Sequence, residues 1–152
     1  MTFDLDRFRR AQTRDYEQAL GEVQAGRKRS HWIWYIFPQL AGLGSSPMAE
    51  TYGLRGVAEA SAYLADPLLR GRLLAVSNAV RAHVDREPPA PLRTVMGSDI
   101  DTLKLVSSMT LFREVAHRAG DEEVASAAEA ILEAARAQGF RECEFTLGRL
   151  DR

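Results

Sequence analysis

The sequence contains a single cysteine, Cys143, so it can form neither an internal disulfide nor a cysteine-based zinc site. Its three histidines, His31, His83 and His117, do not follow the spacing of a metal site. No apolar stretch reaches the roughly 18 residues that suggest a membrane span. The charged segment Met1–Arg10 also lacks the apolar core of a secretory signal. We therefore expect a cytoplasmic protein without a structural metal, a cofactor or a membrane partner.

An excess of charge of one sign is also absent, because 20 basic and 21 acidic residues leave a formal net charge of −1. A domain that binds duplex nucleic acid carries a basic surface, so constitutive duplex binding is not expected. The length of 152 residues, with 45% hydrophobic residues, fits one domain around one hydrophobic core. We expect residues 1–152 to form that single domain.

Apolar residues recur at helical spacing, and no convincing strand-like alternation is present. A short buried helix is expected within 32–40, a second short helix at 57–65, and longer helices at 4–23, 68–84, 99–118 and 122–138. Asp66, Ser98 and Asp121 are the predicted N-caps. Segment 41–47 should be irregular, and 140–150 should add one short turn. The pattern predicts a mostly or wholly α protein of about six helices.

Lysine is scarce, since only Lys28 and Lys104 among the 20 basic residues are lysine. A GC-rich coding background explains this bias. The alternative is that both positions require an ammonium group, which is compact and changes its pKa on burial more readily than a guanidinium. That second explanation gains weight only if the two lysines meet in one site.

The expected helix 99–118 carries polar groups on its apolar side. On a helical wheel, Asp101, Lys104 and Ser108 form one stripe within the arc that also holds Ile100 and Leu105. The opposite arc is the expected solvent face and holds Asp99, Thr102, Val106, Thr110, Arg113, Glu114 and His117. Buried charges are costly unless they are paired. Either Asp101 and Lys104 neutralise each other in the core, or the stripe lines a cavity that can hold an anion and move a proton.

Two further features have a structural and a functional interpretation. The basic cluster 27–29 precedes Trp32 and Trp34, so the segment either binds phosphate and stacks a base or forms a solvated turn before a core segment. Gln12 lies in the apolar stripe of the first helix, where its amide either bonds to the backbone or faces a pocket.

Two long strings, HWIWYIFPQL at 31–40 and KLVSSMTLF at 104–112, resemble domain-of-unknown-function family 1810, and the match extends over about residues 4–115. The resemblance implies a small multi-helical domain of the kind found in bacteria and fungi. Many members carry the name calpastatin without matching its inhibitory repeats. The sequence is also similar to the NADAR superfamily in the types of residue it carries, but the order of the motifs does not match. This similarity implies a helical pocket that breaks an N-glycosidic bond of an ADP-ribose-type substrate with a lysine, an acidic residue and aromatics.

The sequence therefore favours a polar-aromatic pocket for a small anionic ligand, NAD-derived or ADP-ribose-like, with hydrolysis of that ligand left open. Lys104 would supply the chemistry together with Asp101 and Ser108. The predicted ligand-binding residues are Gln12, Lys28, Arg29, His31, Trp32, Trp34, Gln39, Tyr52 and Ser107.

The rival hypothesis is a non-enzymatic module that binds a protein partner. It would use the segment Trp32–Leu40 and the loop Gly42-Leu43-Gly44, and it predicts exposed tryptophans in a contiguous apolar patch.

Overall fold

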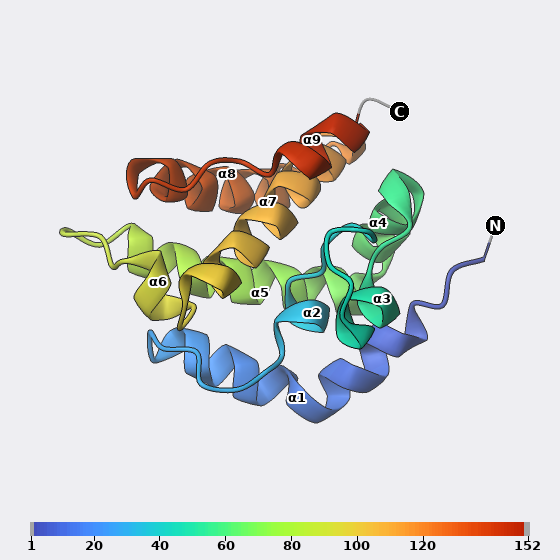
Figure 1. Cartoon of the computed structure of the whole chain (residues 1–152), viewed down its shortest axis with the longest axis horizontal. Helices are drawn as coiled ribbons and strands as arrows, with labels where there is room; N and C mark the ends of the chain where they lie inside the picture. The colour runs from blue at the N-terminus through green and yellow to red at the C-terminus, as the bar shows by residue number, and fades with distance from the viewer. Residues whose placement is uncertain (1, 151–152) are drawn as a thin grey trace.

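The computed structural model describes residues 2–150, which contain helices and no strand (Figure 1). The helices are α1 (Asp6–Gln24), α2 (Ile33–Ile36), α3 (Pro47–Tyr52), α4 (Gly56–Ala65), α5 (Pro67–Val84), α6 (Leu92–Val95), α7 (Asp99–Ala119), α8 (Glu122–Ala137) and α9 (Glu144–Leu150). The prediction of one mostly helical domain is confirmed, but the expected number of about six is wrong. The helices α3 and α6 are too short to produce a helical period in the sequence.

Three long helices, α5, α7 and α8, begin where their capping residues predict. The side-chain oxygens of Asp66, Ser98 and Asp121 each accept a hydrogen bond from the backbone amide three residues later. Such a cap satisfies one of the amides that a helix start leaves without a partner, and its loss typically costs about 1 kcal/mol. The caps therefore fix the starts of α5, α7 and α8.

Helix α7 crosses the middle of the molecule and contacts α4, α8 and α9, with α2 and α6 packed against its first half (Figure 1). All residues from 105 to 112 are buried in consequence. The predicted solvent face is wrong at Thr102, Val106 and Thr110, which are at most 1% exposed, and Ile100 is 68% exposed instead of buried. A helical wheel assumes one packed face, whereas neighbours surround the middle of α7.

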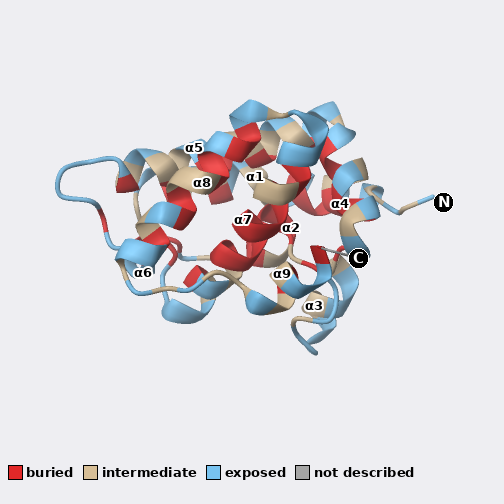
Figure 2. Cartoon of the chain, turned by 90° about the horizontal axis from the view of Figure 1, so that it is seen from above, coloured by how far each residue is buried: buried red, intermediate tan, exposed pale blue. Residues whose placement is uncertain are grey.

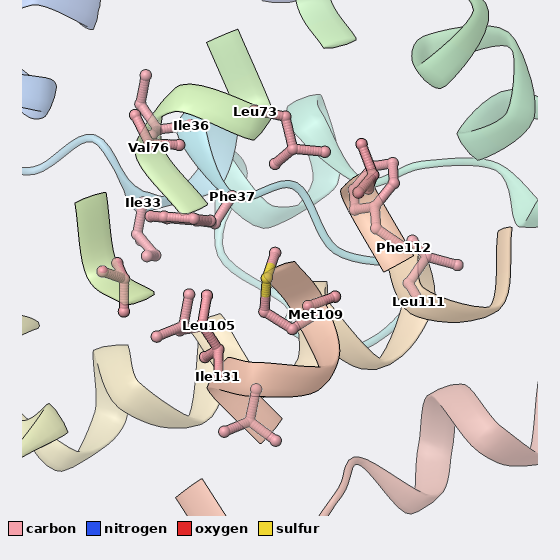
Figure 3. Packing of buried hydrophobic residues seen from close by; sticks show 14 of the residues in the cluster. Ile33, Ile36, Phe37, Leu73, Val76, Leu105, Met109, Leu111, Phe112 and Ile131 are labelled. Atoms are coloured by element: carbon pink, nitrogen blue, oxygen red, sulfur yellow. The ribbon is translucent and has the colours of Figure 1, made fainter. Parts of the chain in front are cut away.

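The core lies between α2, α5, α7 and α8. Side chains of Ile33, Ile36 and Phe37 point toward α5 and α7 (Figure 3), and Figure 2 shows the buried residues gathered around α2 and α7. Burying each large apolar side chain stabilises the fold by roughly 1.5–3 kcal/mol. The segment Trp32–Leu40 is therefore mainly a core element.

The loop between α2 and α4 is fixed by the backbone and by one arginine. Leu54 donates to the Gln39 carbonyl at 2.8 Å, and a Cβ on Gly53 would come within 2.7 Å of the Ala41 Cα. Arg7 donates to the carbonyls of residues 51 and 53 and to the buried carboxylate of Glu59. These contacts hold the loop as one wall of a cleft.

Two absences hold for the part of the chain that the structure describes. None of the helices in residues 2–150 combines the length and the apolar character needed to cross a bilayer. Within the same residues, no three His, Cys, Asp or Glu side chains gather closely enough to bind a metal ion.

Candidate functional site

The two lysines of the sequence meet at one carboxylate at the start of α7. Lys28 Nζ lies 2.8 Å from Asp101 Oδ2, and Lys104 Nζ lies 3.7 Å from Asp101 Oδ1. The two lysines therefore meet in one cluster, which is the condition under which their scarcity supports a requirement for an ammonium group at both positions. The closer partner of Asp101 is Lys28, not the Lys104 that the helical wheel had paired with it.

Lys28 reaches this cluster because the loop before α7 contacts its backbone on two sides. Its amide donates to the Val95 carbonyl at 2.8 Å, and Gly97, with φ +85°, packs against the Lys28 carbonyl. The ammonium also donates to the Ser30 carbonyl, and the side chain is only 5% exposed. Lys28 therefore forms a buried ammonium group that is paired with the partly buried carboxylate of Asp101.

Each lysine lies over a tryptophan ring. Lys28 Nζ is 4.9 Å from the centroid of Trp32, and Lys104 Nζ is 4.8 Å from the centroid of Trp34, within the range of a cation–π contact. Trp32 is buried, whereas Trp34 is half-buried. The two pairs therefore differ in access, with Lys28–Trp32 inside the fold and Lys104–Trp34 open to solvent on one side.

The open pair borders a cleft of about 1020 Å³. Three separate parts of the chain line it: residues 34–53, the first half of α7 and the segment 139–144 between α8 and α9. Of the residues predicted from the sequence, five line the cleft: Trp34, Gln39, Tyr52, Lys104 and Ser107.

The other predicted site residues lie elsewhere: Gln12, Lys28, Arg29, His31, Trp32, Asp101 and Ser108 do not line the cleft. The amide of Gln12 is buried and donates to the Tyr35 carbonyl at 2.9 Å and to the Tyr63 hydroxyl at 3.0 Å. Ser108 is fully buried, and its hydroxyl has no hydrogen-bond partner among residues 2–150. The structure therefore does not assemble Lys104, Asp101 and Ser108 as one catalytic group in the cleft.

The basic segment 27–29 belongs to a turn that is built around the carboxylate of Glu22. The amides of Arg29 and Ser30 donate to Glu22 at 2.8 and 2.9 Å, and Trp32 Nε1 donates to it at 2.9 Å. Burial alone would raise the pKa of Glu22, but these bonds and one from the Ser30 hydroxyl outweigh it and lower the pKa to about 2. Because the carboxylate of Glu22 already accepts from these two amides, they are not available to a bound anion.

The sequence analysis did not predict that residues 139–144 form a wall of the cleft. Arg136 donates to Glu142 at 2.8 Å, and a hydrogen bond from Arg113 holds the pKa of Glu142 below its ordinary value. Cys143, which also lines the cleft, accepts a hydrogen bond from the Thr146 hydroxyl at 3.3 Å. No spacing in the sequence signals that this segment folds back against α7.

The comparisons with known proteins agree with each other. A family model described as a protein of unknown function (DUF1810) matches residues 2–139. Among solved structures, the chain is similar to a conserved hypothetical protein from Mycobacterium tuberculosis. The two share 38% sequence identity with a TM-score of 0.83, over 99% of this chain and 98% of that chain. No curated protein matches the sequence.

Proposed function

The chain belongs to the DUF1810 family of proteins of unknown function, and from the geometry of its cleft we propose that it binds a small organic anion beside Trp34 and Lys104. The resemblance to family 1810 in the sequence is confirmed by this membership. The family description states no ligand, so the proposal rests on the cleft itself.

The observation that carries the proposal is the position of the Lys104 ammonium. It lies against the Trp34 ring at the edge of the cleft, and its side chain is 28% exposed. Its carboxylate neighbour, Asp101, is held more closely by Lys28, at 2.8 Å against 3.7 Å. An anion in the cleft therefore has an ammonium group to contact and an aromatic face on which a planar group can stack.

Hydrolysis of an ADP-ribose-like ligand is not part of the proposal. It would need a group in the cleft that transfers a proton or attacks a sugar carbon beside Lys104. Asp101, which was predicted to set the charge state of an attacking or proton-donating Lys104, does not line the cleft, and neither does Ser108. ADP-ribose and NAD remain useful probes, because each combines a planar base with negative charge.

Binding of a protein partner through Trp32–Leu40 is the weaker alternative. Trp32 is 1% exposed, and only Trp34 and Gln39 within that segment are not buried. The contiguous exposed tryptophan surface that this alternative predicts is therefore not formed, and Leu43 of the neighbouring loop contributes to the cleft instead.

The proposal is tested by thermal unfolding of the wild type, Lys104→Met and Arg86→Met with ADP-ribose, NAD, AMP and 2-naphthoate. Arg86 is exposed and does not line the cleft, so its variant controls for the loss of one positive charge. A probe at about 100 times its Kd should stabilise the protein by about 2.7 kcal/mol.

We expect at least one of these probes to raise the Tm of the wild type and of Arg86→Met, and to lose this effect in a folded Lys104→Met. If every probe raises the Tm of Lys104→Met as much as that of the wild type, the anion site is not at Lys104.

A further inference from the structure

Two of the three acidic side chains that line the cleft are paired with arginines outside the lining. Asp99 lies 3.2 Å from Arg93, and Glu142 is bound by both Arg113 and Arg136. These carboxylates therefore neither attract a cationic ligand strongly nor repel a nearby anion at full strength.

The cationic side chains in the lining are few. Lys104 shares its charge with Asp101, while Arg141 and Glu144, of opposite sign, have no ion-pair partner among residues 2–150. The cleft has no cluster of cations of the kind that surrounds several phosphate charges. It presents one ammonium group at its aromatic wall.

Two exposed apolar side chains line the cleft. Ile100 is 68% and Leu103 is 52% exposed, and they are two of the three large hydrophobic side chains that the described residues expose. Leu43 and Phe140 line the cleft with them. A ligand that covers these side chains removes apolar surface from water, so its body should be apolar or aromatic.

We infer that the ligand is an organic monoanion, a carboxylate on an apolar or aromatic body, rather than a phosphate ester or a dinucleotide. This inference rests on the proposed function and specifies its ligand class. One carboxylate can be matched by the Lys104 ammonium, whereas the other cation of the lining, Arg141, is exposed to solvent and would compensate a second desolvated negative charge poorly.

The test is calorimetric titration of the protein at pH 7.5 with four probes: 2-naphthoate, 2-naphthol, 2-naphthyl phosphate and acetate. The three naphthyl probes share one body and differ in the charge of the head group, and acetate carries the charge without the body. We expect 2-naphthoate to bind at least tenfold more tightly than each of the other three.

Two variants separate the contribution of charge from that of apolar contact. Lys104→Met should lower the affinity for 2-naphthoate to that for 2-naphthol and leave the affinity for 2-naphthol unchanged. Leu103→Ser should weaken all three naphthyl probes by a similar factor, whereas Arg86→Met should change none of them.

The possible failures are distinguishable. If 2-naphthyl phosphate binds more tightly than 2-naphthoate and its binding depends on Lys104, the monoanion class is overturned and the anion site remains. If acetate binds as tightly as 2-naphthoate, the inference that the ligand has an apolar body is overturned. If no probe binds the wild type, or if Lys104→Met affects none of them, the proposed function fails as well.

Discussion

At the scale of single residues, the two lysines have different tasks although they share Asp101. Lys28 is buried and bonded on two sides, whereas Lys104 is 28% exposed and more distant from the carboxylate. The scarcity of lysine drew attention to both positions and left open whether they meet in one site. The sequence could not predict which of the two lysines lies closer to Asp101. That depends on the contacts between the loop before α7 and the backbone of Lys28.

We predict that Lys28→Met lowers the free energy of unfolding by about 1.5–3 kcal/mol, because it removes charged hydrogen bonds to partly buried acceptors. Lys104→Met should lower it by less than about 1 kcal/mol, the usual range of a partly exposed ion pair. Urea denaturation of both variants and of Arg86→Met measures the difference. A larger loss in Lys104→Met than in Lys28→Met would show that Lys104 is the structural lysine.

A second residue-scale prediction concerns Gly97, where a Cβ would lie 2.9 Å from the Lys28 carbonyl oxygen. Gly120 is the matched control, because its φ of +71° is also left-handed but its Cβ would have open space. Gly120→Ala should cost about 1 kcal/mol for the backbone conformation alone. Gly97→Ala should cost at least about 1 kcal/mol more, because the backbone of Lys28 must move. Equal losses in urea denaturation would rule out this close approach.

At the scale of elements, the turn after α1 depends on one carboxylate. Because the folded pKa of Glu22 is about 2, below its ordinary 4.5, the carboxylate stabilises the fold fully above pH 4.5. That contribution is lost as the pH falls from 4.5 towards 2. We predict that Glu22→Gln lowers the free energy of unfolding by about 1.5–3 kcal/mol at pH 7.

The difference between the wild type and Glu22→Gln should shrink as the pH is lowered through that window, as chemical denaturation at pH 7, 4 and 3 can follow. Glu17→Gln, an exposed change on the same helix, should leave the pH profile unchanged. A constant difference at all three pH values would mean that Glu22 does not act through its charge.

The elements that could be predicted are those with a local signal. Asp66, Ser98 and Asp121 mark the helix starts with a side-chain cap, and such a cap needs only the next three residues. The burial of Thr110 could not be predicted in the same way. It depends on which other helices surround α7, and the helical wheel of a single helix does not contain that information.

At the scale of the whole molecule, the cleft exists only because three distant segments meet. Trp34 and Lys104 lie within the two distinctive strings of the sequence, and both were predicted as site residues. The wall at 139–144 lies at and beyond the end of the family match over residues 2–139. Its position depends on ion pairs of Glu142 with Arg113 of α7 and Arg136 of α8, which no periodicity reveals.

This dependence leads to a prediction about Arg113, whose guanidinium ties Glu142 of that wall to α7 and also lies 3.0 Å from Glu129 of α8. Arg70 is the matched control, because it joins α5 to Asp121 at 2.7 Å and to Glu123 at 3.1 Å but contacts no part of the cleft. Arg113→Met and Arg70→Met should each lower the free energy of unfolding by about 1–3 kcal/mol.

Only Arg113→Met should also weaken 2-naphthoate binding, by several-fold, because a loosened wall must be ordered again when the ligand binds. Calorimetric titration of the two variants, at a temperature where both remain folded, measures this difference. Equal affinities would mean that the wall is held by its remaining contacts, such as Arg136 with Glu142. An affinity loss in Arg70→Met as large as that in Arg113→Met would instead trace the effect to global stability, and the wall would then have no separate part in binding.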